Sequence, residues 1–121
     1  MDAQPREIRI YRTKDDRSPF KEWLAKLKDR QAEARIDVRL ARLRNGNLGD
    51  VKSVGEGVFE LRIDYGPGYR VYFANSGETL VVLLCAGDKR TQTADIKLAK
   101  KYWNDYLSRS TDESEESDEQ G

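Results

Sequence analysis

The feature that most restricts how this chain can fold is a pattern of alternating side chains around Gly66-Pro67-Gly68. Before this turn, apolar residues occupy every second position between Glu60, Arg62 and Asp64, and the alternation resumes after the turn. The apolar positions are Phe59, Leu61, Ile63 and Tyr65, followed by Tyr69, Val71 and Phe73. A period of two is typical of half-buried strands, so the pattern predicts an antiparallel hairpin.

The pleat of this hairpin predicts its register. A three-residue loop would set Tyr65 opposite Tyr69, with Ile63 opposite Val71 on the same face. This register gathers the apolar residues on one face, whereas a slip by one residue would mix the two faces. We therefore expect one face of the hairpin to be buried and the other to be polar.

The polar face of the hairpin is predicted to carry Arg62, Asp64, Arg70 and Tyr72. In the expected register Arg70 lies opposite Asp64, and Arg62 lies on the diagonal, about 7–8 Å from Arg70. Two interpretations stay open. Arg70 and Asp64 form a weak surface ion pair while Arg62 extends into solvent, or the two arginines hold a phosphate group.

Ahead of the hairpin, the sequence predicts a strand, two helices and a loop. Two isoleucines alternate with charged residues in the strand, residues 6–12. Ser18 and Pro19 suit the N-cap and first position of a helix, and a second helix over about residues 31–44 ends at Asn45-Gly46. Residues 45–57 contain four of the nine glycines and are predicted to form a loop.

After the hairpin, the sequence predicts a central strand and a last helix. The run from Leu80 to Ala86 is apolar without alternation, as expected of a strand covered on both faces. Apolar residues at helical spacing then predict an amphipathic helix that ends near Leu107. The expected order is strand, helix, helix, three strands and helix, and 121 residues suit one domain.

Composition excludes several kinds of chemistry. The chain has no histidine, which excludes a Ser-His-Asp triad and histidine acid–base catalysis. Its one cysteine, Cys85, cannot form an internal disulfide and fits a reducing, cytoplasmic setting. No stretch approaches the roughly 18 apolar residues of a membrane span, and the polar N-terminus lacks a secretory signal. No metal or cofactor is implied.

The charge is unevenly distributed along the chain. Residues 108–121 hold six acids and only one base, Arg109, so residues 1–107 carry a surplus of five positive charges. Because no apolar residue follows Leu107, residues 108–121 are predicted to be a disordered acidic tail outside a domain of residues 1–107. The tail either keeps the protein soluble or shields the basic body. A basic body indicates a polyanionic partner.

Two cations and two tyrosines are open to more than one interpretation. Lys89 and Arg90 directly follow the last predicted strand, where they form a solvated helix entrance or bind an anion. Tyr69 and Tyr72 offer rings on which RNA bases can stack. Ordinary packing is the alternative, above all for Tyr69, which the expected register turns toward the core.

The stretch "GVFELRIDYGPGYRVYF", followed by "LLCAGDKRTQTADIKLAKKYW", resembles the RelE/ParE superfamily of toxins, and more narrowly its HigB-like branch of addiction module killer proteins. The resemblance covers roughly residues 5–107 and is specific because these motifs occur in this order and spacing. It implies a small α+β fold, in which an N-terminal helical hairpin packs on a mainly antiparallel, twisted four-stranded sheet and a helix ends the chain.

The resemblance also implies site residues. In RelE-like enzymes, cations before the tight turn, after it and after the last strand surround the scissile phosphate. They correspond here to Arg62, Arg70 and Lys89. Glu60 replaces a lysine of the family and is the nearest candidate for a catalytic base. The residues expected to bind RNA are Arg90, Gln92, Tyr72 and Tyr69.

The function implied by the resemblance is that of the toxin in a type II toxin–antitoxin module. Such a toxin cuts messenger RNA on the ribosome by attack of a 2′-hydroxyl on the adjacent phosphodiester. The implied partners are a helix-turn-helix, HigA-like antitoxin and messenger RNA on the ribosome. Two alternatives stay open, namely a ParE-like inhibitor of gyrase and a catalytically weakened member that acts through antitoxin binding and operon regulation.

Overall fold

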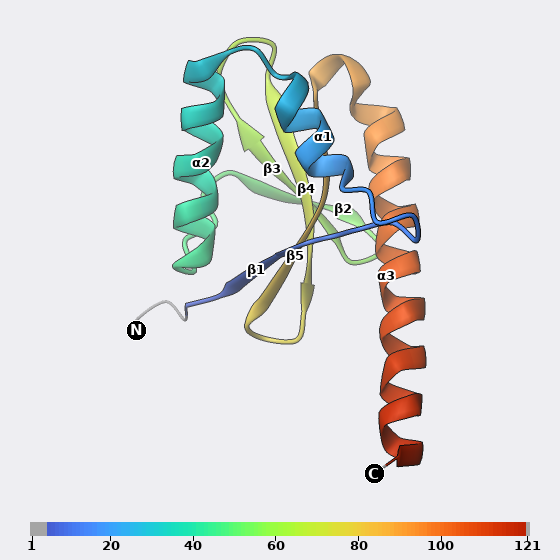
Figure 1. Cartoon of the computed structure of the whole chain (residues 1–121). Helices are drawn as coiled ribbons and strands as arrows, with labels where there is room; N and C mark the ends of the chain where they lie inside the picture. Colours follow the sequence, from blue (N-terminus) through green and yellow to red (C-terminus); the bar gives the residue numbers. More distant parts are fainter. Residues whose placement is uncertain (1–4, 121) are drawn as a thin grey trace.

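The computed structural model describes the backbone of residues 5–120 and the side chains of residues 5–110. Its elements are β1 (Glu7–Ile10), α1 (Pro19–Lys26), α2 (Arg30–Arg44), β2 (Val51–Gly55), β3 (Val58–Ile63), β4 (Tyr69–Ser76), β5 (Leu80–Asp88), the 3-10 turn η1 (Lys89–Thr91) and α3 (Gln92–Gln120) (Figure 1). The strands form one sheet in the order β1-β5-β4-β3-β2. Among the strands of the described residues, only β1 and β5 pair in parallel. The predicted α+β class is confirmed.

Within residues 5–120 the sheet has five strands, so the prediction of four was wrong. The additional strand is β2, whose sequence VKSVG falls within the predicted loop of residues 45–57. It lies at an edge and pairs antiparallel with β3. A strand of five residues is too short for its side-chain periodicity to identify it. This edge strand is defined by its hydrogen bonds to β3, which the local sequence does not show.

Capping residues fix the starts of the two N-terminal helices. The Ser18 hydroxyl accepts a hydrogen bond from the backbone N–H of Lys21 at 3.2 Å, and Pro19 takes the first helical position, as predicted. Asp29 caps α2 in the same way and accepts from two backbone N–H groups. At the other end of α2, Gly46 has a φ of 86°, a conformation that glycine adopts without strain. These local signals explain why the sequence predicted both helices.

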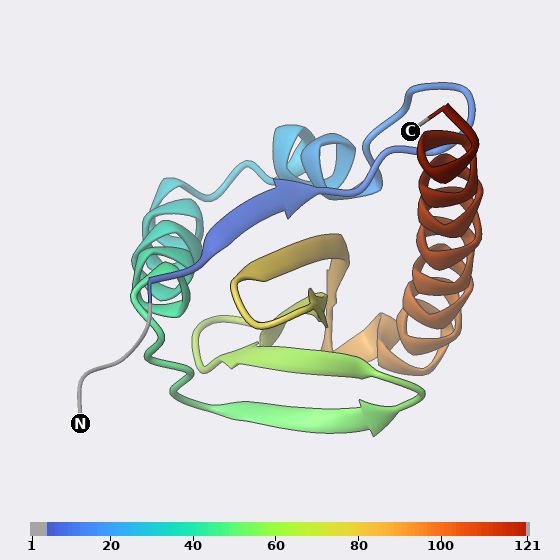
Figure 2. The ribbon, with the colours of Figure 1, turned by 90° about the horizontal axis from the view of Figure 1, so that it is seen from below.

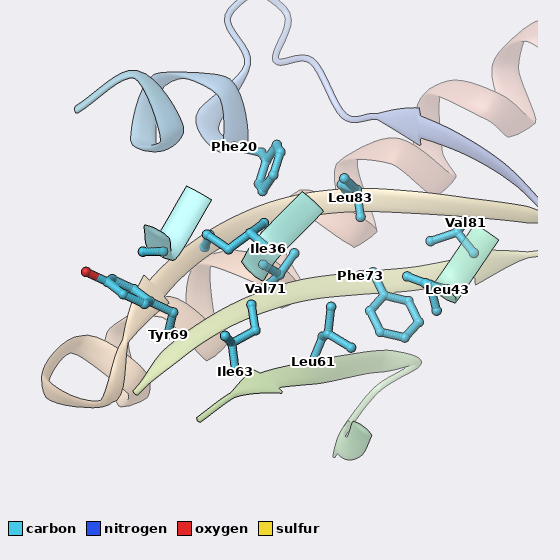
Figure 3. Packing of buried hydrophobic residues seen from close by; sticks show 12 residues of the cluster. Phe20, Ile36, Leu43, Leu61, Ile63, Tyr69, Val71, Phe73, Val81 and Leu83 are labelled. Carbon is cyan, nitrogen blue, oxygen red and sulfur yellow. The ribbon is translucent and has the colours of Figure 1, made fainter. Parts of the chain in front are cut away.

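Both faces of the sheet are covered, which explains the continuous apolar run of β5. Helices α1 and α2 cover one face and α3 covers the other (Figure 2). Along β5, Val81 and Leu83 pack toward α1 and α2, whereas Val82 and Leu84 pack toward α3. Figure 3 shows the core under α1 and α2, which contains Phe20, Ile36, Leu43, Leu61, Ile63, Val71 and Phe73. The prediction of a strand buried on both faces is confirmed.

The cysteine lies in the core under α3. Cys85 is buried among this second cluster, and burial raises the pKa of its thiol to about 12. At neutral pH the thiol is therefore protonated, and it is not a nucleophile. Cys85 thus lies within the apolar run from Leu80 to Ala86 that predicted a strand covered on both faces.

The register of the β3–β4 hairpin differs from the prediction by two residues. Ile63, not Tyr65, lies opposite Tyr69, and the connection spans residues 64–68. A shift of two residues keeps every side chain on its predicted face, so the hydrophobic pattern could not distinguish the two registers. The shift changes the charged pairs, however. Arg62 lies directly opposite Arg70, and the predicted Arg70–Asp64 pair is absent among the described ion pairs.

Helix α3 is longer than predicted. The sequence indicated an end near Leu107, but the helical backbone continues to Gln120. The side chains of residues 111–121 lie outside the described residues, so the division into a domain of residues 1–107 and an acidic tail of residues 108–121 stays a prediction. Within the described chain, no helix combines the length and the hydropathy needed to cross a membrane.

At Gly87, near the end of β5, the residues that begin α3 lie so close that no side chain fits. A Cβ atom at Gly87 would lie 1.9 Å from Asp95 Oδ2 and 2.8 Å from Thr91 Oγ1. The Thr91 hydroxyl donates a hydrogen bond of 2.5 Å to Asp95 Oδ2, which holds the carboxylate in this place. The absence of a side chain at Gly87 therefore sets how closely η1 and α3 approach β5.

We expect Gly87→Ala to lower the free energy of unfolding by about 1–3 kcal/mol, the usual cost of overpacking a well-packed site. Asp95→Ala in the same chain should restore part of this loss, because it removes the atom nearest to the new methyl group. Urea denaturation of the wild type, both single variants and the double variant measures the coupling. Strictly additive effects would contradict the proposed contact.

Candidate functional site

Three of the predicted cations line one cleft of about 380 Å³ at the turn end of the β3–β4 hairpin. They are Arg62 on β3, Arg70 on β4 and Lys89 in η1. Arg62 and Arg70 are direct partners in the ladder, and Arg70 pairs in turn with Gly87, two residues before Lys89. The remaining wall consists of Asp50, Ile63, Asp64, Gly66, Pro67 and Gly68. The fold thus collects three cations from three separate elements.

Two arginines directly opposite each other repel, and a buried carboxylate offsets this repulsion. Glu60 on β3 is 0% exposed. Its Oε1 accepts a hydrogen bond of 2.8 Å from Arg62 Nε, and its Oε2 lies 3.9 Å from Arg70 Nε. The Glu60 carboxylate therefore holds both guanidinium groups at the cleft.

Two neutral donors complete the surroundings of Glu60. Its Oε2 accepts one hydrogen bond of 3.0 Å from the Tyr72 hydroxyl and another of 2.8 Å from Gln92 Nε2. Tyr72 lies on β4 and Gln92 begins α3, so a single carboxylate connects two strands and a helix. Buried charges in proteins are retained where they are paired and hydrogen-bonded in this way.

These contacts decide the charge state of Glu60. Burial by itself would raise the pKa of the carboxyl, but hydrogen bonds from Arg62, Gln92 and Tyr72, together with the charge of Arg70, lower it below the ordinary value. A low pKa and two occupied oxygens make Glu60 a poor proton acceptor. The sequence offered Glu60 as a catalytic base, and the geometry gives it the role of a positioning residue instead.

Arg70 is buried but incompletely satisfied. The residue is only 9% exposed, and its Nε has no hydrogen-bond partner within the described chain. Arg62 is more open, with one third of its side chain exposed, and uses its Nε for Glu60. Arg70 thus has a charge partner in Glu60 but, among the described residues, no hydrogen bond from its Nε. With Arg62 and Lys89 it lines a cleft whose positive charge suits an anion.

The two other polar residues expected to bind RNA occupy different positions. Arg90 is an ion-pair partner of Asp88 at 2.9 Å, its side chain is 81% exposed, and it does not line the cleft. Gln92 contacts Glu60 rather than the cleft surface. Lys89 therefore joins the arginines, whereas Arg90 forms the solvated helix entrance.

Neither predicted stacking platform is available to a base. Tyr72 is fully buried and hydrogen-bonded to Glu60, and Tyr69 is 8% exposed in the core, edge-on to Trp23 with 5.8 Å between the ring centroids. Direct base stacking on these two rings is therefore excluded by their burial. Tyr69 packs toward the core, as the predicted face required.

Two carboxylates in the cleft wall were not among the predicted site residues. Asp64 follows β3 in the turn, and Asp50 precedes β2. Neither has an ion-pair partner within the described part of the chain. The sequence placed Asp64 on the polar face beside the turn, which could have marked it as a site residue. It was not chosen because it was expected to lie opposite Arg70 as an ion-pair partner. Nothing in the local sequence of Asp50 indicated that it would reach this cleft.

Two comparisons relate this chain to known proteins. Residues 22–104 match the family described as Phage derived protein Gp49-like (DUF891). An uncharacterized protein of Haemophilus influenzae is 59% identical over 81 residues, which cover 67% of this chain and 82% of the relative. The matched segment in the family comparison includes all residues of the cleft.

We expect Glu60→Gln to lower the free energy of unfolding at pH 7 by about 3 kcal/mol, because it leaves two arginines without their buried counter-charge. A carboxyl whose pKa is lowered by folding stabilises the protein above the unfolded pKa, and this contribution disappears as the pH falls through the folded pKa. The difference between wild type and variant should therefore shrink below about pH 4.5.

Urea denaturation between pH 7 and pH 3.5 tests this prediction. Glu78→Gln, at an exposed position in the β4–β5 connection, is the matched control and should change stability little. A difference that stays constant or grows toward acidic pH would show that Glu60 is not the stabilising carboxylate.

Proposed function

The chain belongs to the Gp49-like phage-derived protein family, which is associated with RelE-like toxins of toxin–antitoxin systems, and we propose that it is a ribosome-dependent endoribonuclease that acts as the toxin of a type II module. The observation that carries this proposal is the cleft in which Arg62, Arg70 and Lys89 meet above the buried Glu60. Fixed cations around a small open cleft suit a phosphodiester whose charge increases in the transition state.

The proposed reaction is attack of a ribose 2′-oxygen on the adjacent phosphorus. The new P–O2′ bond forms as the P–O5′ bond breaks, which leaves a 2′,3′-cyclic phosphate on one fragment and a 5′-hydroxyl on the other. Arg62 and Arg70 bind the phosphate oxygens, and Arg70 is the more rigid donor because it is nearly buried. Lys89 holds the phosphate or donates a proton to the leaving 5′-oxygen. Neither step requires a metal ion.

A base must accept the proton of the 2′-hydroxyl, and we assign this role to Asp64. Both oxygens of Glu60 are already occupied, whereas Asp64 lines the cleft and is exposed. The turn of the hairpin that carries both arginines also carries Asp64, while Asp50 belongs to the loop before β2. The ribosome would add to the rate by orienting the RNA, because positioning alone lowers such barriers substantially.

The proposed partners follow from this function. Messenger RNA on the ribosome is the substrate, and a helix-turn-helix, HigA-like antitoxin is the inhibitor that holds the toxin inactive. The proposed site of action is the cytoplasm, where translation takes place. The family association supports an antitoxin partner, and the specific type of antitoxin belongs to the proposal.

Arg70→Ala should lower RNA cleavage by about 10²–10³-fold, the usual loss when one fixed donor to a developing charge is removed. Mapping of messenger RNA 5′ ends after induction in translating cells measures the loss. Arg90→Ala is the matched control and should cleave within a few-fold of wild type, because Arg90 lies outside the cleft. Arg70→Lys, which keeps the charge, tests whether the buried position tolerates a change without unfolding.

The same experiment can overturn the proposal. Absence of cleavage above background with the wild-type protein would reject the endoribonuclease. Inhibition of DNA supercoiling by gyrase with intact messenger RNA would favour the alternative of a gyrase inhibitor.

Asp64→Asn should lower the cleavage rate by about 10²-fold or more, because loss of a general base removes a contribution of that size. Asp50→Asn, a second exposed carboxylate in the same wall, is the matched control and should retain most of the activity. Single-turnover cleavage on programmed ribosomes separates the chemical step from binding. The opposite result, with Asp50 required and Asp64 dispensable, would transfer the role to Asp50.

A further inference from the structure

A second hollow adjoins the cleft. A groove of about 490 Å³ runs along α2, and Ile63 and Asp64 at the end of β3 line both the groove and the cleft. On the α2 side the groove is lined by Arg35, Arg39 and Arg42, with Val38 between them. The two hollows thus share a wall, and a chain-like ligand in one can continue into the other.

The arginines of α2 are not neutralised by the protein itself. The helix RQAEARIDVRLARLR contains five arginines and two acids, yet none of these arginines forms an ion pair within the described part of the chain. Elsewhere arginines do pair, as Arg17 does with Glu22 and Arg109 with Asp105. Residues three and four apart share a helix face, so positions 35, 39 and 42 form one stripe of positive charge.

Arg39 fixes the shape of this groove. Its guanidinium donates hydrogen bonds to the backbone carbonyls of Arg62, Leu48 and Asp50, the last two at 3.3 Å. This side chain therefore ties α2 to the end of β3 and to the loop before β2. Its donors are largely used in this structural role, which leaves Arg35 and Arg42 as the exposed cations of the groove.

Arg35 lies over an aromatic ring. Its guanidinium carbon lies 4.6 Å from the centroid of the Tyr65 ring, and the Tyr65 hydroxyl lies 3.3 Å from both Asp29 Oδ1 and Gln31 Oε1. A guanidinium plane that is already ordered offers its outer face to a nucleobase at a low entropic cost. The predicted tyrosine platforms are buried, but this arginine on Tyr65 supplies an exposed one.

We propose that the α2 groove binds the single-stranded RNA that flanks the phosphate in the cleft, with Arg42 pairing to a backbone phosphate and Arg35 stacking on a base. The inference rests on the proposed function, because it is the strand held at Arg62, Arg70 and Lys89 that continues into the groove. The Asp64 carboxylate repels phosphate, so the strand crosses the shared wall with a sugar or a base. The α2 arginines thereby extend the RNA contact beyond the reacting nucleotides.

Direct RNA binding tests this inference without any need for cleavage. The probe is a fluorescein-labelled 20-nucleotide RNA of mixed sequence, methylated at every 2′-oxygen so that it cannot be cut. Fluorescence anisotropy in 50–200 mM KCl should show about tenfold weaker binding for Arg35→Ala/Arg42→Ala at 100 mM salt. The salt dependence of log K should also become shallower by about 0.7 for the lost phosphate contact.

The matched control is Lys97→Ala/Lys101→Ala, which removes the same charge from α3, on the opposite side of the sheet from α2 (Figure 1). This control should change RNA affinity by no more than about twofold, because its cations lie outside the groove. Arg42→Glu alone keeps the Arg35–Tyr65 contact and should weaken binding at least as much as Arg42→Ala. Thermal melts confirm that each variant is folded.

The outcomes separate this inference from the proposed function. If Arg35→Ala/Arg42→Ala left RNA affinity and its salt dependence unchanged, the proposal that the α2 groove binds RNA would be overturned, whatever the cleavage result. Weaker RNA binding by this variant would support RNA binding in the α2 groove even if the wild type did not cleave RNA on ribosomes. Absence of cleavage would reject only the proposed endoribonuclease activity. Tighter binding of a fluorescein-labelled 20-residue polyglutamate than of RNA, lost in the same variant, would overturn the inference in favour of an acidic protein partner.

Discussion

The buried carboxylate of Glu60 is the interaction on which the cleft depends. It is fully enclosed by the protein, and it accepts hydrogen bonds from Arg62, Tyr72 and Gln92 while lying 3.9 Å from Arg70 Nε. Without it, two guanidinium groups would face each other across the ladder with no counter-charge. Because its partners come from β3, β4 and α3, the same carboxylate that orders the cations also joins the hairpin to the last helix.

The two faces of the β3–β4 hairpin carry different kinds of side chain. On one face of β3 and β4, apolar residues pack under α1 and α2, as Figure 3 shows. On the other face, toward α3, Glu60 and the two arginines replace apolar contacts near the turn, where the sheet opens to solvent. Arg39 connects the two sides, because it reaches from α2 to the carbonyl of Arg62 at the end of β3. The groove and the cleft therefore meet at this strand end.

The arginines of this protein differ in the groups that their guanidinium contacts. Arg90 is paired with Asp88 in solvent, Arg39 donates to backbone carbonyls, and Arg70 lies under the cleft beside its buried partner Glu60. An exposed ion pair such as Arg90–Asp88 contributes little to stability, whereas the ion pair of Glu60 with Arg62 and Arg70 holds two cations at the wall of the cleft. The proposal of an anion site therefore rests on where the cations gather, at one cleft, rather than on their number.

The sequence by itself determined every α-helix and strand except β2, the order of these elements and the two faces of the hairpin, because periodicity and capping are local signals. It also identified Arg62, Arg70 and Lys89 as the cations of interest. Only the tertiary structure decided the register, since a shift of two residues preserves every face, and only pairing with β3 revealed β2. The burial of Glu60 and Tyr72 and the place of Asp64 in the cleft wall likewise came only from the tertiary structure. Burial and hydrogen bonding depend on residues far apart in the chain, such as Glu60 and Gln92, and no local pattern records such contacts.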